Sequence, residues 1–136
     1  MNLREQLIRD ERCVLRVYND SLGVPTIGVG RNLRDKGLSQ HEADILLDND
    51  ILEVSAAVTS NLPWTMGLDE PRRAVLLNMA FNMGLGGLME FTKTLAHVEA
   101  GEFHEASLEM LRSTWATQVG DRAVRLSIQM RTGEWQ

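Results

Sequence analysis

The chain has 136 residues, 43% hydrophobic and 24% charged, which suits one globular domain with a core that needs no disulfide or metal. Its 14 Lys and Arg against 19 Asp and Glu give a net charge of −5, which argues against a general nucleic-acid binder because phosphates must be met by cations. The single cysteine, Cys13, excludes an intrachain disulfide. No run of about 18 apolar residues is present, so we expect no stable membrane insertion.

The first third of the chain changes from a helical to a β pattern. Apolar residues at helical spacing predict an amphipathic helix over residues 1–11. Between residues 14 and 34, β-forming residues, Pro25 and several glycines favour a small sheet, with a turn at residues 21–23. We therefore expect one helix followed by a short hairpin-like sheet.

The remainder of the chain is predicted to be helical. Ser39 and Glu42 form a capping-box pattern, so a long helix should begin at Ser39 and stop before Pro63. Pro71 suits the first turn of another helix, which we expect to end at Gly84-Leu85-Gly86-Gly87. Further helices are predicted at about 92–100, 103–112 and 121–130. The expected class is α+β and mostly helical, with a small sheet.

Three polar residues in the first 26 positions carry the strongest chemical signal. Glu11 closes the first helix, Asp20 lies in the turn and Thr26 lies in a strand. A glycosidase needs one carboxylic acid to protonate the leaving oxygen and a second carboxylate to activate water or attack the sugar. A hydroxyl beside the second carboxylate could hold that water. Each residue alone also has an ordinary structural role, and sequence spacing leaves inverting and retaining chemistry both open.

Other motifs do not indicate a cofactor or a metal. His41, His97 and His104 are scattered without zinc-ligand spacing. Gly28-Val29-Gly30 is not followed by the pattern of a dinucleotide-binding loop. We therefore expect neither a cofactor nor a metal ion.

Blocks of sequence in the same order along the chain resemble phage-type lysozymes. The catalytic segment of that family is similar to D-E-R-C-V-L-R-V-Y-N-D-S-L-G-V-P-T-I-G-V-G. The resemblance returns in P-R-R-A-V-L-L-N-M-A-F-N-M-G, in S-T-W, in D-R-A-V-R and in R-T-G-E-W. Glu11, Asp20 and Thr26 fall on the catalytic triad of the family.

The resemblance implies a fold and an activity. The fold would be a single lysozyme-like domain over residues 1–136, with a cleft between two lobes. One lobe would hold the sheet and the linking helix, at about 12–62, and the helical lobe would hold 1–11 and 63–136. The activity would be inverting hydrolysis of the β-1,4 bond between N-acetylmuramic acid and N-acetylglucosamine in peptidoglycan. Glu11 would be the acid, and Asp20 with Thr26 would activate water.

The resemblance also implies substrate-binding positions and a biological setting. Arg122 matches an arginine that pairs with the catalytic glutamate. The enzyme would be a monomeric phage or prophage endolysin. Because residues 1–6 lack the apolar region of a signal peptide, it would stay in the host cytoplasm until a separate holin lets it reach the periplasm and cell wall. The residues that match saccharide-binding positions are Asn32, Phe81, Asn82, Thr94 and Glu109.

Several positions depart from the family pattern. Arg12 replaces a glycine directly after the catalytic glutamate, and a positive φ there would strain an arginine. Arg31 replaces a histidine whose aspartate partner matches Asp50, so we predict an Arg31–Asp50 ion pair. The segment between Arg31 and Ser39 is shorter than in the family, which predicts a smaller first lobe.

Three alternatives remain at this point. The chain could be a catalytically weak or inactive wall-binding protein on the same fold. It could be a lytic transglycosylase, although Asp20 together with Thr26 favours water as the acceptor. It could also be a toxin effector with the same chemistry, which gene context would separate.

Overall fold

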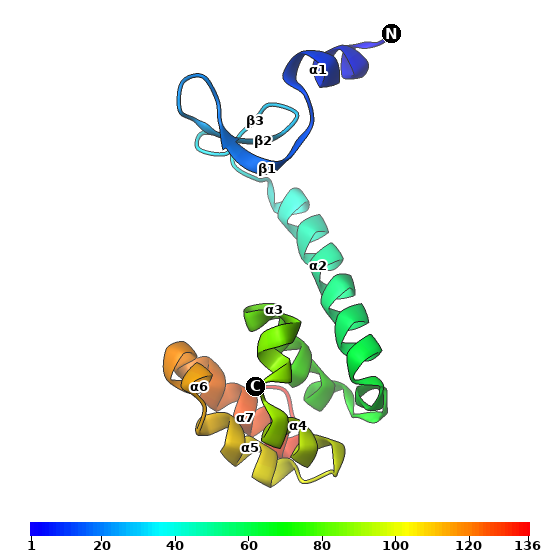
Figure 1. Ribbon diagram of the computed structural model, residues 1–136, viewed down its shortest axis with the longest axis vertical. Coiled ribbons are helices and arrows are strands. Elements are labelled where there is room, and N and C mark those ends of the chain that lie inside the picture. The colour runs from blue at the N-terminus through cyan, green and yellow to red at the C-terminus, as the bar shows by residue number, and fades with distance from the viewer. The chain divides into compact units, whose positions relative to one another are not determined.

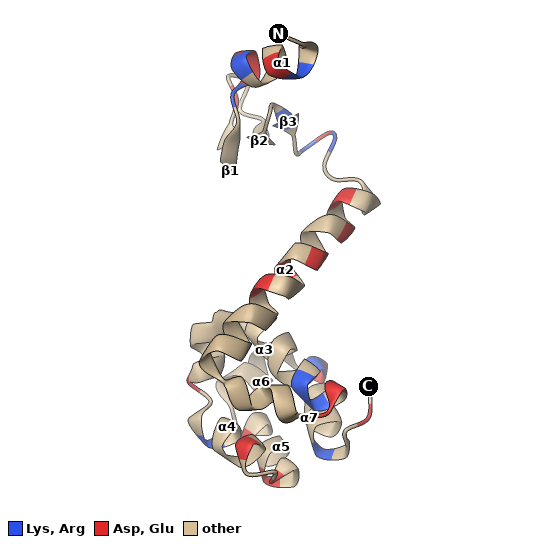
Figure 2. Cartoon of the chain, turned by 90° about the vertical axis from the view of Figure 1, so that its right-hand side faces the viewer, with Lys and Arg blue, Asp and Glu red and all other residues tan.

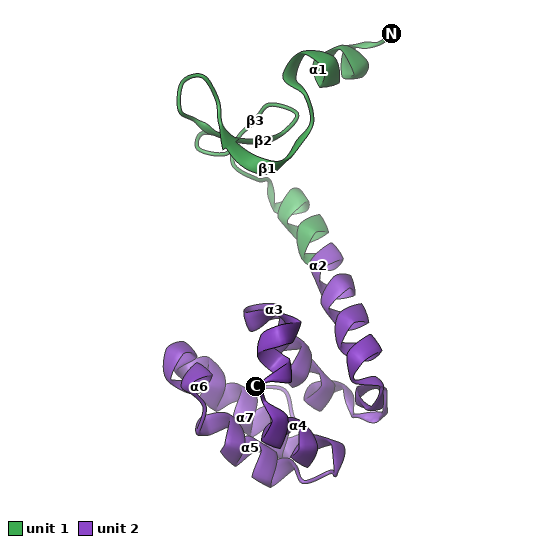
Figure 3. Cartoon of the chain, viewed as in Figure 1, with its two compact units in different colours: residues 1–47 green, residues 48–136 purple.

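The computed structural model describes residues 1–136 and divides into two compact units, Met1–Leu47 and Asp48–Gln136. The boundary between the units falls within one helix, as the colours in Figure 3 show. Seven α-helices and a three-stranded antiparallel sheet form an α+β fold of the lysozyme-like type, so the predicted fold class is confirmed. The lobe boundaries expected from the sequence stay a prediction.

Unit 1 contains a short helix and the whole sheet (Figure 1). Helix α1 (Leu3–Glu11) begins with a capping box in which Asn2 accepts from the Glu5 backbone and Glu5 accepts in return. The sheet has the order β1-β2-β3, and the turn at residues 21–23 joins its first two strands as predicted. The strands are β1 (Val14–Asn19), β2 (Pro25–Gly28) and β3 (Arg31–Asn32).

Helix α2 (Gln40–Asn61) has the predicted beginning and end. Ser39 accepts from the Glu42 backbone while the Glu42 side chain accepts from the Ser39 backbone, which is the expected capping box. The helix stops before Pro63, which opens the 3₁₀ helix η1 (Pro63–Gly67). Figure 2 shows acidic residues along α2 and no basic residue.

Unit 2 is built around one apolar core. Helix α3 (Glu70–Met89) supplies more of its buried side chains than any other helix, including Val75, Leu76 and Met79. Phe91 and Trp115 meet edge to face, with ring centroids 6.0 Å apart. The remaining helices are α4 (Thr92–Glu99), α5 (Phe103–Leu111), α6 (Thr114–Val119) and α7 (Asp121–Thr132).

Two predictions about the helical part need correction. The glycine run does not end α3, because Gly84 interrupts the helix with φ 78° and ψ 164° and the chain becomes helical again up to Met89. Helix α6 was not predicted at all; Ser113 caps it by accepting from the Ala116 backbone. Gly84 lacks a Cβ and adopts a backbone that other residues rarely adopt, so it breaks the helix while Gly86 and Gly87 remain helical.

No single helix has the length and apolar composition needed to cross a membrane. Helices α3 and α4 meet those criteria only as a pair, and they are bent by 104° at the break between them. Their buried apolar residues belong to the core of unit 2.

Candidate active site

The side chains of Asp20 and Thr26 both bind the backbone of one residue, Val24. The Val24 N–H donates to Asp20 Oδ1 at 2.9 Å, and the Thr26 hydroxyl donates to the Val24 carbonyl at 2.8 Å. Asp20 Oδ1 also accepts from the Leu22 backbone at 2.8 Å, as is usual for an aspartate that shapes a turn. These bonds leave Asp20 Oδ2 without a protein partner.

Thr26 lies at the centre of the small sheet. It is 4% exposed and is the buried residue of unit 1. Its cross-strand partners are Tyr18 on β1 and Asn32 on β3. The hydroxyl donates its proton to Val24, so its lone pairs are left to accept a hydrogen bond from another molecule. The structure therefore brings the predicted residue Asn32 beside Thr26, and it adds Tyr18, which the sequence analysis did not single out.

Glu11 ends α1 as predicted, and its carboxylate lies against Gly30 in the turn between β2 and β3. A Cβ placed on Gly30 would lie 2.8 Å from Glu11 Oε2 and 3.0 Å from Glu11 Cδ. Gly30 also has φ +64°, a backbone that side chains disfavour. Gly30 therefore satisfies two requirements, a backbone with positive φ and space for the Glu11 carboxylate. The sequence pattern alone predicted neither requirement.

Arg12 has the backbone that was predicted to strain it. Its φ of 63° and ψ of 166° place it in a region that is essentially restricted to glycine. It is the only non-glycine residue in the structure with positive φ. Such a conformation costs of the order of 1–3 kcal/mol unless the surroundings offset it. The strain lies directly after Glu11, where the chain leaves α1 for β1.

Arg31 has a partner inside unit 1, whereas the predicted Arg31–Asp50 ion pair would join the two units and stays a prediction. Arg31 binds Glu42 through two guanidinium nitrogens, one of them 3.0 Å from Oε1. The hydrogen bonds from Arg31 and from Ser39 lower the pKa of Glu42 to about 2. Asp50 lies eight residues further along α2, or about 12 Å at 1.5 Å per residue. Arg31 is therefore held at the first turn of the helix.

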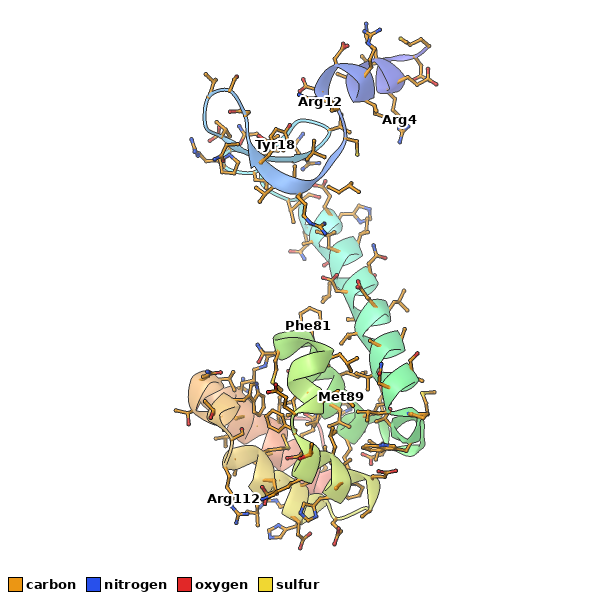
Figure 4. All side chains as sticks on the ribbon, in the orientation of Figure 1. Arg4, Arg12, Tyr18, Phe81, Met89 and Arg112 are labelled. Atoms are coloured by element: carbon orange, nitrogen blue, oxygen red, sulfur yellow. The ribbon has the colours of Figure 1, made fainter.

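The substrate-binding residues predicted in unit 2 lie around two hollows. Thr94 and Glu109 line a hollow of about 520 Å³ that also contains Trp115. Asn82 accepts a hydrogen bond from the Trp115 indole at 2.8 Å, so it positions the wall of that hollow. Phe81, which Figure 4 labels on α3, is 48% exposed and lines a hollow of about 460 Å³ with Asp50 and Glu53.

Two charged residues of unit 2 have partners within that unit. Glu109 accepts from Arg112 at 2.9 Å. Arg122 donates two hydrogen bonds to Asn78 Oδ1, at 2.7 and 3.0 Å. The pairing of Arg122 with Glu11 stays a prediction. No group of three His, Cys, Asp or Glu side chains is placed where it could hold a metal ion.

Comparison with known proteins assigns the family. The model of the family described as phage lysozyme matches residues 9–132. The chain belongs to the phage lysozyme family. This lysozyme-family chain is 29% identical to "Probable T4-type lysozyme 2" of Dictyostelium discoideum, with 97% of the chain and 95% of the relative covered. It is 26% identical to "Probable T4-type lysozyme 1" of the same organism, with 97% and 95% covered.

A third relative is a larger protein. The chain is 29% identical to the "Pre-baseplate central spike protein Gp5" of Enterobacteria phage T4, and 98% of the chain matches only 28% of that relative. All three alignments span 161 or 162 positions, so the relatives carry residues that this lysozyme-family chain of 136 residues lacks. Family membership supports a muramidase-type function.

Proposed function

We propose that this chain is an endolysin-type muramidase that hydrolyses the β-1,4 bond between N-acetylmuramic acid and N-acetylglucosamine in peptidoglycan. The observation that carries the proposal is the shared hold of Val24 on Asp20 and Thr26. It leaves one carboxylate oxygen of Asp20, beside the turn, and one hydroxyl lone pair of Thr26, on β2, without a protein donor, and the activation of water requires such a pair of groups. Family membership supports the same chemistry.

In the proposed mechanism one carboxyl group acts on the leaving oxygen and the other acts on the attacking water. Glu11 donates a proton to the leaving glycosidic oxygen. A water molecule donates one hydrogen bond to Thr26 Oγ1 and gives its other proton to Asp20 Oδ2 as its oxygen attacks the anomeric carbon. The glycosidic bond breaks as the new bond forms, and the resemblance to phage-type lysozymes supports inversion at that carbon.

The remaining predicted residues would bind the glycan. Phe81 offers an exposed aromatic face on which a sugar ring can stack. Thr94 and Glu109 offer polar atoms around the hollow that Trp115 completes. Asn82 would act through the Trp115 indole that it binds, and Asn32 would act beside Thr26.

The experiment combines product analysis with three variants on purified peptidoglycan. Wild type should release reducing ends, and Glu11→Gln and Asp20→Asn should lower the rate at least a hundredfold, which matches the usual contribution of acid–base groups. Asp10→Asn is the matched control, because Asp10 adjoins Glu11 on α1 and pairs with Arg9. Full activity in Glu11→Gln would contradict the mechanism. Early appearance of the retained anomer would contradict inversion.

One observation favours a second function, a wall-binding protein that does not turn over its substrate. Arg12 replaces the flexible glycine beside Glu11 and is strained there. This alternative predicts that the protein sediments with peptidoglycan and releases no reducing ends. Products with anhydro-muramic ends would instead identify a lytic transglycosylase.

The setting of the enzyme is part of the proposal. We expect a monomer that is released from the host cytoplasm with the help of a separate holin and that then acts on the cell wall. Sedimentation in solution tests the monomer. Co-expression with and without a membrane-permeabilising protein tests release, since lysis should require both proteins.

A further inference from the structure

Arg12 combines a strained backbone with a guanidinium that no residue of unit 1 binds. Its φ of 63° and ψ of 166° belong to a glycine conformation, and all other positive-φ residues are glycines. Its side chain is exposed and forms no hydrogen bond or ion pair within unit 1. Glycine would relieve the strain at this position, and no contact of the arginine within unit 1 offsets it.

Other arginines of unit 1 have partners, whereas Arg12, like Arg4, has none within that unit. Arg9 pairs with Asp10 at 2.8 Å, and Arg31 pairs with Glu42. Arg34 donates to the Gly23 carbonyl at 3.3 Å. Of the two arginines without a partner in unit 1, Arg12 is the one that directly follows the residue proposed as the acid. Figure 4 labels it where α1 ends.

We infer that Arg12 binds a carboxylate of the peptidoglycan stem peptide when a glycan strand is held at Glu11. This inference rests on the proposed function, because it assumes that the wall strand reaches Glu11. Stem peptides are attached to muramic acid, one of the two sugars that flank the bond to be cleaved, and they carry free carboxylates. A guanidinium matches a carboxylate with two parallel hydrogen bonds and keeps its charge at any working pH.

The role predicts which kinetic constant changes. Arg12 contacts a part of the substrate that does not react, so its loss should raise KM and leave kcat nearly unchanged. Arg12 is then a specificity residue that distinguishes peptide-bearing strands from bare glycan. Since both partners are charged and exposed, the advantage of wild type should shrink as salt is added.

The test uses the whole protein and two substrates. One is peptidoglycan with intact stem peptides, freed of teichoic acid; the other is the same glycan after an amidase has removed the peptides. On the first substrate Arg12→Gly should raise KM about tenfold, the usual order for a hydrogen bond to a charged group. Arg12→Lys should recover part of this effect. On the stripped glycan the variants and wild type should agree.

Two controls separate binding from folding and from net charge. Arg12→Gly should raise Tm by about 2–4 °C, because glycine relieves the backbone strain, so its lower activity cannot reflect unfolding. Arg4→Ala removes the same charge from the other end of α1, where Arg4 also has no partner, and should leave KM unchanged on both substrates (Figure 4).

The outcomes have distinct meanings. An unchanged KM in Arg12→Gly on peptide-bearing strands overturns the inference, and so does an equal rise in KM on stripped glycan. If Arg12→Gly raises KM only on walls that retain teichoic acid, Arg12 binds the phosphates of teichoic acid. That result overturns the inference that Arg12 binds a stem-peptide carboxylate. Wild type that is inactive on both substrates refutes the proposed function instead.

Discussion

Residues 1–47 and residues 48–136 are held in shape by different interactions. Unit 1 buries only Thr26, and its arrangement rests on hydrogen bonds of turns and on glycines with positive φ. Unit 2 contains every side chain of the apolar core, from Val58 to Met130. The proposed reacting groups lie in the unit without an apolar core. The molecule therefore separates the residues that determine its chemistry from those that supply most of its stability.

The two units also differ in charge. Residues 1–47 carry seven Lys or Arg and seven Asp or Glu, whereas residues 48–136 carry seven and twelve. The whole net charge of −5 therefore belongs to unit 2. An overall acidic protein can still offer a neutral surface around Glu11 and Asp20, so the net charge is a poor guide to how the unit with the proposed site meets an anionic wall.

Truncation of the core should have the largest effect on stability. Met79→Ala removes a fully buried side chain of unit 2 and should lower the free energy of unfolding by about 2–5 kcal/mol. The matched change in unit 1 is Leu22→Ala, at a leucine that is 85% exposed, and it should stay within about 0.5 kcal/mol. Denaturant unfolding measures both. Equal losses would contradict the division of roles.

Removal of a hydrogen bond inside unit 2 should have the second-largest effect on stability. Asn82→Ala leaves the buried Trp115 indole N–H without its acceptor, which should cost about 1–3 kcal/mol. Asn82→Gln keeps an amide acceptor and should recover part of the loss. Tryptophan fluorescence during unfolding follows this change. An unaltered Asn82→Ala protein would show that the hydrogen bond does not hold Trp115.

Substitution of a site glycine should affect activity more than stability. Gly30→Ala adds a Cβ within 2.8 Å of Glu11 Oε2 and should lower activity at least tenfold, with a cost of roughly 1–2 kcal/mol from the backbone. Gly101→Ala is the control, because Gly101 has φ +77° and nothing within 4 Å of an added Cβ. It should lose similar stability and keep full activity. Activity assays beside thermal unfolding separate the two effects.

The smallest expected effect is a loss of stability at low pH that results from Glu42. The pKa of Glu42 is lowered to about 2 in the folded state by Arg31 and Ser39, so the unfolded state binds more protons below pH 4.5. The stabilisation is present above that pH and is lost as pH falls towards 2. Glu42→Gln should therefore have a lower Tm than wild type at pH 6, and the gap should close by pH 2. Asp48→Asn, on the same helix, is the control and should show no such closing gap.

Local patterns in the sequence predicted the parts of the fold that depend on adjacent residues. The helix that begins after Ser39 and ends before Pro63 was predicted correctly, because caps and proline act within one turn. Helix α6 was missed, since its six residues are too short to show periodicity. The helical stretch after Gly84 was missed because a glycine run does not reveal which glycine adopts positive φ.

The sequence predicted which residues form the candidate site and their local structure, but it did not predict the contacts between them. The helix end at Glu11, the turn at Asp20 and the strand at Thr26 follow from the pattern and are present. The contact of Glu11 with Gly30 joins residues distant in sequence, so no local pattern encodes it. The sequence analysis did not name Glu42 as a partner of Arg31 for the same reason, because that choice depends on which helical turn the guanidinium reaches. The pairing of Tyr18 with Thr26 follows from the predicted turn at residues 21–23, although Tyr18 itself was not singled out.

The bonds of Val24 affect how freely the sequence of this site can change. Its amide and its carbonyl hold Asp20 and Thr26, while its side chain takes no part in either bond. Every amino acid except proline supplies the same two main-chain groups. Position 24 can therefore drift through evolution while the geometry of its two neighbours is inherited unchanged, and a protein engineer can alter it to tune the rim of the site.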